Sequence, residues 1–259
     1  MTAADRSLAS SSCMDTYWLE QTEAELPEDD AWLSAVELSR LRGLRFPKRR
    51  ADWRLGRWTA KCAVATYLNL PSDARTLATI EIRAAASGAP EVFLADKAAA
   101  VVISLSHSAG TAACALASPG ASLGCDLEIV EPHSDGFIAD YFTADEQASI
   151  ARTVAADRSL LVALLWSAKE SALKTLREGL RLDTRSVQVS CGPEQQQCTR
   201  AWHPLQARCA DGQVFHGWWQ RNGNLVRTLI AVPAPSQPIA LNLGAANRSQ
   251  GAPTKRASR

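Results

Sequence analysis

The sequence lacks the features of membrane-spanning and disulfide-stabilised proteins. No apolar run approaches the roughly 20 residues that a membrane-spanning helix needs, and the polar N-terminus does not resemble a signal peptide. The seven cysteines include no C-x-x-C pair, and several lie in apolar segments. This pattern is typical of buried, reduced thiols. We therefore expect a cytoplasmic protein that binds no membrane.

Net charge is also nearly absent, at +1 for 259 residues. This balance argues against a general nucleic-acid-binding protein, but it conceals two runs of opposite sign. Residues 15–30 contain seven acids and no base, whereas residues 40–61 contain nine bases and a single acid, Asp52. An anionic ligand would therefore bind at the second segment.

Two common catalytic patterns are missing or weak. No G-x-S-x-G motif is present, and Ser106 and His107 are neighbours at the end of a predicted strand. Their side chains therefore point to opposite faces, which disfavours a serine nucleophile activated by histidine. A zinc site remains a minor alternative, because its four candidate ligands fit no standard zinc spacing: Cys191, Cys198, His203 and Cys209.

Hydrophobic periodicity predicts an α+β protein with two halves that meet near residue 121. The predicted helices cover residues 30–41, 47–68 and 157–178, with a further helix starting at a capping box from Thr143 to Glu146. The predicted strands cover 79–83, 100–106, 111–117, 123–130, 186–190, 201–209, 214–221 and 225–232. Short turns between successive strands indicate antiparallel pairing.

The domain boundaries follow from composition. Residues 1–12 and 238–259 are small and polar, and both are expected to be disordered. The two folded halves are then expected at residues 13–121 and 122–237.

The segment LGCDLEIV, residues 123–130, is a predicted core strand that carries two acids. Because side chains alternate along a strand, Asp126 and Glu128 share one face. They are suited to holding a hard cation such as Mg²⁺, which prefers oxygen ligands. A strand with its polar face in solvent explains the same spacing.

A predicted helix and a basic segment offer further charged candidates. Glu170 and Lys174 are four residues apart, which is also typical of a surface ion pair, although Trp166 and Leu173 beside them suggest a second packing partner. Four bases at helical spacing between residues 48 and 61 would attract phosphate, or would form a solvated helix face: Arg50, Arg54, Arg57 and Lys61.

Taken in order, these motifs resemble the Sfp-type 4'-phosphopantetheinyl transferases over about residues 40–185. The most distinctive part is the pair G-C-D-L-E at 124–128 and W-S-A-K-E-S-A-L-K at 166–174. The other matching segments are R-R-A-D-W-R-L-G-R at 49–57, G-A-P at 88–90, I-S-L-S-H-S at 103–108 and Y-F-T-A-D-E at 141–146.

The resemblance implies two similar α+β halves related by a pseudo-twofold axis, with antiparallel sheets packed against long helices and coenzyme A between them. It also implies an enzyme that transfers the 4'-phosphopantetheine group of coenzyme A to a serine of an apo acyl or peptidyl carrier protein, releasing 3',5'-ADP. Mg²⁺ would be required, with Mn²⁺ as a possible substitute. A monomer is expected, and four pathways stay open for the carrier: polyketide, non-ribosomal peptide, siderophore and fatty-acid synthesis.

The resemblance also implies roles for individual residues. Asp126, Glu128 and Glu170 would bind Mg²⁺, and Glu170 would be the base, directly or through a metal-bound water. Lys174 would stabilise charge on the phosphates or pass a proton to the leaving group. The expected contacts to coenzyme A come from Arg49, Arg50, Arg54, Arg57, Ser106, His107, Lys169 and Lys174.

Two positions in the motifs carry less certain implications. Glu146 matches a further acid at the cleft of the family. Many relatives have lysine where this chain has Ala89, so one basic contact to coenzyme A is missing here.

Two alternatives to the transferase remain open on the sequence. One is a Mg²⁺-dependent nucleotide phosphohydrolase built from the same acids and bases, with water in place of the carrier serine. The other is a degenerate module that binds coenzyme A or a nucleotide without catalysis. The three carboxylates and Lys174 argue against the second alternative, because a binding module does not need a base.

Overall fold

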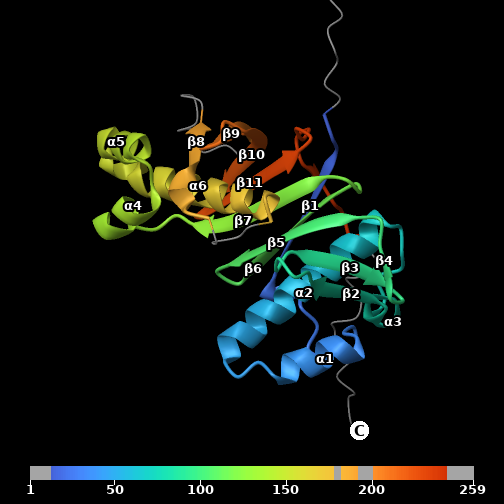
Figure 1. The fold of residues 1–259 in the computed structure, drawn as a ribbon. Helices are drawn as coiled ribbons and strands as arrows, with labels where there is room; N and C mark the ends of the chain where they lie inside the picture. Colours follow the sequence, from blue (N-terminus) through green and yellow to red (C-terminus); the bar gives the residue numbers. More distant parts are fainter. Residues whose placement is uncertain (1–12, 178–181, 192–200, 244–259) are drawn as a thin grey trace, which may run out of the picture.

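The computed structural model describes residues 13–177, 182–191 and 201–243. The N-terminal half begins with strand β1 and then forms helices before its remaining strands (Figure 1). Its elements are β1 (Thr16–Thr22), η1 (Glu23–Glu25), α1 (Ala35–Arg42), α2 (Pro47–Tyr67), α3 (Ala74–Ala78), β2 (Ile80–Ala84), β3 (Pro90–Leu94), β4 (Lys97–Ala98), β5 (Val102–Ser108) and β6 (Thr111–Ala117).

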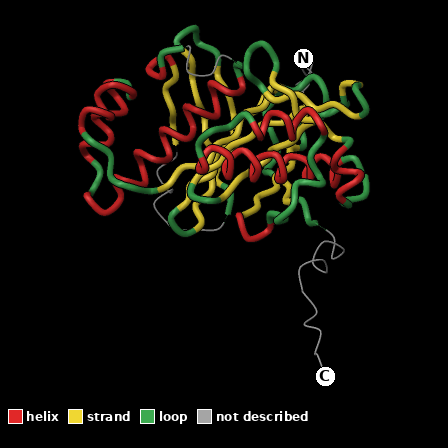
Figure 2. The backbone as a smooth tube through the Cα atoms, turned by 90° about the horizontal axis from the view of Figure 1, so that it is seen from below, coloured by secondary structure: helices red, strands yellow, loops and turns green. Residues whose placement is uncertain are grey.

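The C-terminal half follows the same general order of strand, helices and strands. Its elements are β7 (Ser122–Ile129), α4 (Asp135–Tyr141), α5 (Ala144–Arg152), α6 (Ala155–Thr175), η3 (Thr184–Ser186), β8 (Val187–Cys191), β9 (His203–Cys209), β10 (Val214–Asn222) and β11 (Leu225–Val232). Helices α4 and α5 project from one end of the molecule in both views (Figures 1 and 2).

The sheets are almost entirely antiparallel. The C-terminal half forms one sheet of order β7-β11-β10-β9-β8, and the N-terminal half has sheets of order β12-β1-β6-β5 and β2-β3-β4. The single parallel pairing between described strands joins β12 (Ile239–Ala240) to β1. The predicted α+β class with antiparallel sheets and packed helices is therefore confirmed, and among the described helices none is long and apolar enough to cross a membrane.

Each half packs a long helix against its sheet, and a third core joins the halves. Helix α2 contributes Trp58, Cys62 and Val64 to the N-terminal core, and α6 provides much of the C-terminal core. The third core lies between strands of both halves. Its small side chains, which allow close approach, are Ala113, Ala115 and Cys125, and its larger ones are Trp18, Leu127 and Leu229. Strands β5 and β7 therefore lie side by side at the junction of the halves.

A buried ion pair recurs at the matching place in each half. In the C-terminal half, Glu146 completes the capping box of α5 and forms an ion pair with Lys169 of α6, with 2.9 Å between the charged atoms. In the N-terminal half, Glu37 completes the capping box of α1 and pairs with Lys61 of α2. The second oxygen of each glutamate accepts a backbone N–H, from Val189 of β8 or from Ile82 of β2. These shared contacts support the predicted similarity of the halves.

Most predicted helices and strands are found, and the differences lie where local pattern is weak. Strand β1, strand β3 and helix α4 were not predicted. Disorder from residue 238 is wrong for 238–243, because Ile239 and Ala240 pair with β1, and Leu241 and Leu243 pack on the N-terminal core. The other part of that prediction, residues 1–12 and 244–259, lies outside the described residues.

The thiols are also less uniformly buried than expected. Cys62, Cys114 and Cys125 are buried and free, whereas Cys13 is exposed and Cys209 is partly exposed. Burial raises the pKa of the Cys62 thiol to about 12, so this thiol is unreactive. Cys198 of the zinc alternative lies outside the described residues.

Gly124 allows β7 to lie directly against α6. A Cβ atom at this position would lie 1.9 Å from the carbonyl oxygen of Ser171. We predict that Gly124→Ala lowers the free energy of unfolding by about 1–3 kcal/mol or more, because the helix must move away from the strand. Urea denaturation measures this loss. Gly56→Ala is the control, since a Cβ there has no atom within 4 Å, and an equal effect of both variants would contradict the prediction.

Candidate active site

Strand β7 carries Asp126 and Glu128 in the middle of the molecule. The strand pairs with β11 on one side and lies along β5 on the other. Asp126 is buried, with 6% of its surface exposed, and Glu128 is partly buried. The alternative of a strand with both acids in solvent is therefore wrong, because a buried carboxylate needs compensating partners.

Asp126 is held through one of its two oxygens. Ser106 Oγ of β5 donates to Oδ1 over 2.8 Å, and Lys174 Nζ of α6 donates to the same oxygen over 2.8 Å. The second oxygen, Oδ2, is buried and has no hydrogen-bond partner among the described residues. An uncompensated buried carboxylate oxygen is costly, so this atom indicates a place for a missing positive partner.

Helix α6 brings Glu170 and Lys174 to β7. Lys174 Nζ also donates to the carbonyl oxygen of Cys125 over 2.9 Å, which fixes the last turn of the helix to the strand. The alternative of a simple surface pair between Glu170 and Lys174 is wrong, since the ion pair formed by Lys174 is with Asp126. Helix α6 lies along β7, and Trp166, one turn before Glu170, packs against α4.

The pKa values show that three carboxylates repel one another here. Burial, with repulsion from Asp126, Glu131 and Glu170, raises the pKa of Glu128 to about 7. Burial also raises the pKa of Glu170, and Asp126 adds to the effect while Lys174 opposes it. Burial lowers the pKa of Lys174, but the combined attraction of Asp126, Cys125 and Glu170 outweighs it and the pKa is raised overall. Lys174 is therefore charged at neutral pH, and it does not fully compensate the acids.

The three acids on β7 and α6 are oxygen ligands of the kind that a divalent cation would take. Asp126 Oδ2 has no hydrogen-bond partner among the described residues, and burial raises the pKa values of Glu128 and Glu170, with repulsion from the neighbouring carboxylates adding to it. A hard cation with oxygen ligands would relieve both features. Within the described residues, no three such ligands are already assembled around a common point, and Lys174 is the positive group beside Asp126.

Lys169 and Glu146 do not face this site. Lys169 is completely buried and donates to the carbonyl oxygens of Thr184 and Val187 as well as pairing with Glu146. The expectations that Lys169 contacts phosphate and that Glu146 lies at a cleft are therefore wrong. Burial lowers the pKa of Lys169, while Glu146 opposes the effect, and both residues stabilise the fold.

The basic residues of α2 do not form one continuous row. Arg50 donates to the carbonyl oxygens of Leu41 and Leu44, and Arg54 forms a 2.8 Å ion pair with Asp30. Arg57 lies over the ring of Trp53, 5.0 Å from its centre, and 3.9 Å from Glu37. Lys61 is buried against Glu37. Several of these charges are therefore already compensated by the protein.

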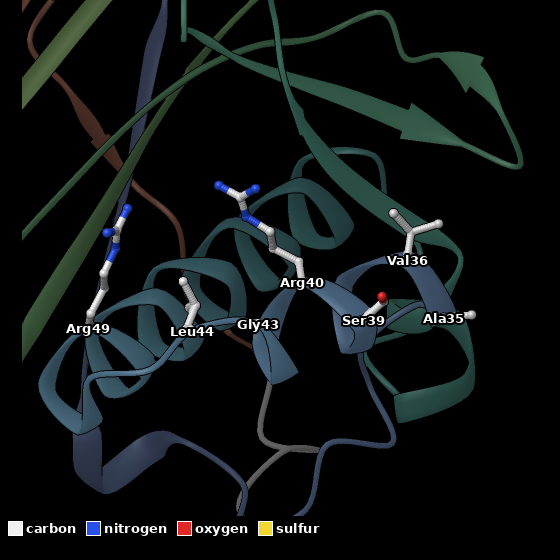
Figure 3. A pocket seen from close by; sticks show the side chains of 7 residues that line it. All are labelled: Ala35, Val36, Ser39, Arg40, Gly43, Leu44 and Arg49. Carbon is white, nitrogen blue, oxygen red and sulfur yellow. The ribbon is translucent and has the colours of Figure 1, made fainter.

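Arg49 has a different setting from the other three arginines. Together with Arg40 it lines a pocket of ≈ 780 Å³ between α1 and the start of α2, and both side chains reach along it (Figure 3). The pocket is lined by residues of α1, of the turn after it and of the start of α2, and not by residues of the strand and helix that carry the three carboxylates. It is a candidate site for an anionic part of a ligand.

Ser106 and His107 have different environments, as the strand alternation predicts. Ser106 is buried beside Asp126, with 9% of its surface exposed. His107 is exposed near the end of β5. His107 can therefore meet a ligand from solvent, whereas the Ser106 hydroxyl is engaged within the protein.

An aromatic cluster beside Glu170 was missed by the sequence reasoning. Phe137 and Tyr141 of α4 lie against Trp166, each with ring centres 5.1 Å apart, and His133 stacks on Phe137 at 4.4 Å. Trp166 lies one helical turn before Glu170. The available signal was Trp166, but helix α4 was not predicted and its aromatic residues had no assigned position.

Comparisons with known proteins agree with this geometry. Residues 122–228 match the model of the 4'-phosphopantetheinyl transferase superfamily. The 4'-phosphopantetheinyl transferase HetI of Nostoc sp. is 26% identical over 194 residues, which are 73% of this chain and 78% of that protein. The matched region contains β7 and α6, with all three carboxylates and Lys174. Residues 122–228 therefore form a domain of the 4'-phosphopantetheinyl transferase superfamily, and the chain is similar over 73% of its length to an enzyme of that class.

Proposed function

We propose that the protein transfers the 4'-phosphopantetheine group of coenzyme A to a serine of an apo acyl or peptidyl carrier protein. The products are the holo carrier protein and 3',5'-ADP, and the metal is Mg²⁺, with Mn²⁺ as a substitute. The observation that carries the proposal is the group of Asp126, Glu128, Glu170 and Lys174 in the region matched by the family model.

The proposed reaction is attack of a serine oxygen on phosphorus. The new bond joins the serine oxygen to the phosphorus of the phosphopantetheine arm, and the bond from that phosphorus to the 3',5'-ADP oxygen breaks. Glu170 takes the hydroxyl proton, and burial raises its pKa, which makes the carboxylate a stronger base. Lys174 stabilises negative charge on the phosphates. The departing 3',5'-ADP takes a proton from solvent or from Lys174.

The cation contributes charge neutralisation at the pyrophosphate. Asp126 and Glu128 would hold it from the strand, and Glu170 would hold it from the helix. Because strand and helix are fixed to each other by Lys174 and by the close contact at Gly124, the ligands are supported by rigid elements. Such support keeps the substrate phosphorus in line with the attacking oxygen.

Coenzyme A contacts are proposed mainly from residues that the protein does not already engage. Arg49 in the α1–α2 pocket and the exposed His107 are the first candidates for the 3'-phosphate end. Arg57 is a further candidate. Arg50 and Arg54 would need to exchange their contacts with Leu41 and Asp30 for a ligand, so their variants are expected to affect folding as well as binding.

Release of 3',5'-ADP distinguishes the proposal from both alternatives. Incubation with coenzyme A and Mg²⁺ should release nucleotide only when an apo carrier protein is added, as followed by chromatography. Release without a carrier would identify a phosphohydrolase. Retention of coenzyme A with no release in the presence of a panel of carriers would identify a binding module.

We predict that Mg²⁺ affinity rises by about tenfold from about pH 6 to about pH 8. Glu128 has a pKa of about 7 without the metal, so at the lower pH a proton must leave before the cation binds. Because folding raises the pKa of Glu128, protonation of this group stabilises the folded state. This contribution to the free energy of unfolding is lost as the pH rises through about 7.

The measurement is a calorimetric titration of Mg²⁺ at the two pH values in the presence of coenzyme A. Glu128→Gln removes the titrating group and should flatten this part of the pH dependence. If the parent chain bound Mg²⁺ with equal affinity at both pH values, the assignment of Glu128 as a ligand would be contradicted.

A further inference from the structure

We infer that Ser106 is a positioning residue of the metal site, which orients Asp126 so that its Oδ2 atom is available to the cation. The inference rests on the proposed function, because the cation belongs to that proposal. It replaces the expected contact between Ser106 and a nucleotide phosphate. Its consequence is that a residue of the N-terminal half controls a metal ligand of the C-terminal half.

Two serines of β5 hold the backbone of β7. Ser104 and Ser106 share one face of β5, because they are two residues apart in a strand. The backbone N–H of Cys125 donates to Ser104 Oγ over 2.9 Å, and the N–H of Leu127 donates to Ser106 Oγ over 3.2 Å. The hydroxyls therefore satisfy donors on the side of β7 that faces β5.

Only the second of these serines reaches a carboxylate. The Leu127 N–H determines the position of Ser106 Oγ, and the single hydroxyl proton then donates to Asp126 Oδ1 over 2.8 Å. Lys174 donates to the same oxygen from α6. With Oδ1 held from two elements, the carboxylate plane is fixed, and the buried Oδ2 is the oxygen that remains for a cation.

The same contacts exclude Ser106 from an independent role in nucleotide binding. Its only proton is donated to Asp126, and only 9% of its surface is exposed. A phosphate oxygen needs a donor, and this hydroxyl has none left to offer. The exposed neighbour His107 is the member of the pair that can contact coenzyme A.

The test compares Ser106→Ala with Ser104→Ala. Each variant removes a hydroxyl that accepts one β7 backbone N–H, but only Ser106→Ala also releases Asp126. Mn²⁺ is titrated into the full chain with coenzyme A present, and free Mn²⁺ is measured by electron paramagnetic resonance, with coenzyme A alone as the blank. Ser106→Ala should weaken Mn²⁺ binding by about tenfold or more, and Ser104→Ala should leave it unchanged.

A second readout separates positioning from general stability. Without metal, Ser106→Ala should lower the melting temperature at least as much as Ser104→Ala, because it also removes the hydrogen bond to Asp126. Ser106→Thr, which keeps the hydroxyl, should retain most of the Mn²⁺ affinity. Equal Mn²⁺ affinity of Ser106→Ala and Ser104→Ala would overturn the inference while leaving the proposed function intact. A parent chain that binds no Mn²⁺ with coenzyme A would overturn both.

Discussion

A Glu170→Gln variant is expected to modify an apo carrier protein roughly a hundredfold to ten-thousandfold more slowly than the parent chain, because it removes a general base. Glutamine keeps the size of the side chain but cannot take the serine proton. It also removes one of three mutually repelling carboxylates. The fold should therefore be retained, and the metal-free protein should be at least as stable as the parent.

The rate of Glu170→Gln is measured as single-turnover formation of holo carrier at saturating coenzyme A and Mg²⁺. Glu131→Gln is the control. Like Glu170, Glu131 raises the pKa of Glu128 by repulsion, but it has no proposed role in the reaction. Its rate should match that of the parent chain. If Glu170→Gln reacted at the parental rate, the assignment of Glu170 as the base would be wrong.

A Lys169→Met variant is expected to lower the free energy of unfolding by about 3–5 kcal/mol, because it leaves the Glu146 carboxylate buried without its charged partner. Both side chains are almost completely inaccessible to solvent. Lys61→Met should have a comparable effect in the other half, since Lys61 pairs with the buried Glu37 in the same way. Urea denaturation measures both losses.

Two further variants make the stability prediction specific. The exposed pair of Arg158 and Asp135 is the surface control, and Arg158→Met should cost less than about 1 kcal/mol. A Glu146→Gln/Lys169→Met double variant should lose less stability than the sum of the two single variants, because the residues act as a pair. A Lys169→Met protein with parental stability and weakened coenzyme A binding would restore Lys169 to phosphate contact.

The sequence predicted the strand and helix of the site well because their patterns are local. Strand alternation placed Asp126 and Glu128 on β7, and helical periodicity located α6. The partners of these residues could not be predicted in this way. The contact from Ser106 to Asp126 joins residues 20 positions apart, and that from Lys174 joins residues 48 positions apart, so both depend on the packing of β5, β7 and α6.

The errors have the same physical origin. Strand β1 was not predicted because the acids of residues 15–30 were read as a charged segment. Glu20 on this strand forms an ion pair with Arg227 of β11, which is 207 positions away, so the sequence pattern could not indicate this partner. Lys169 and Glu146 carry charges that suggest a ligand site, yet tertiary packing buries them against each other. The one local hint was the capping box, which already required Glu146 at the start of α5.

The most direct test of the proposed function is the intact mass of an apo carrier protein after incubation with this chain, coenzyme A and Mg²⁺. A panel of carriers is needed, together with versions in which the acceptor serine is replaced by alanine. The proposed function predicts a mass gain of one phosphopantetheine on at least one carrier, its absence on the alanine version, and an equal amount of 3',5'-ADP. Release of 3',5'-ADP with no mass gain on any carrier would contradict it.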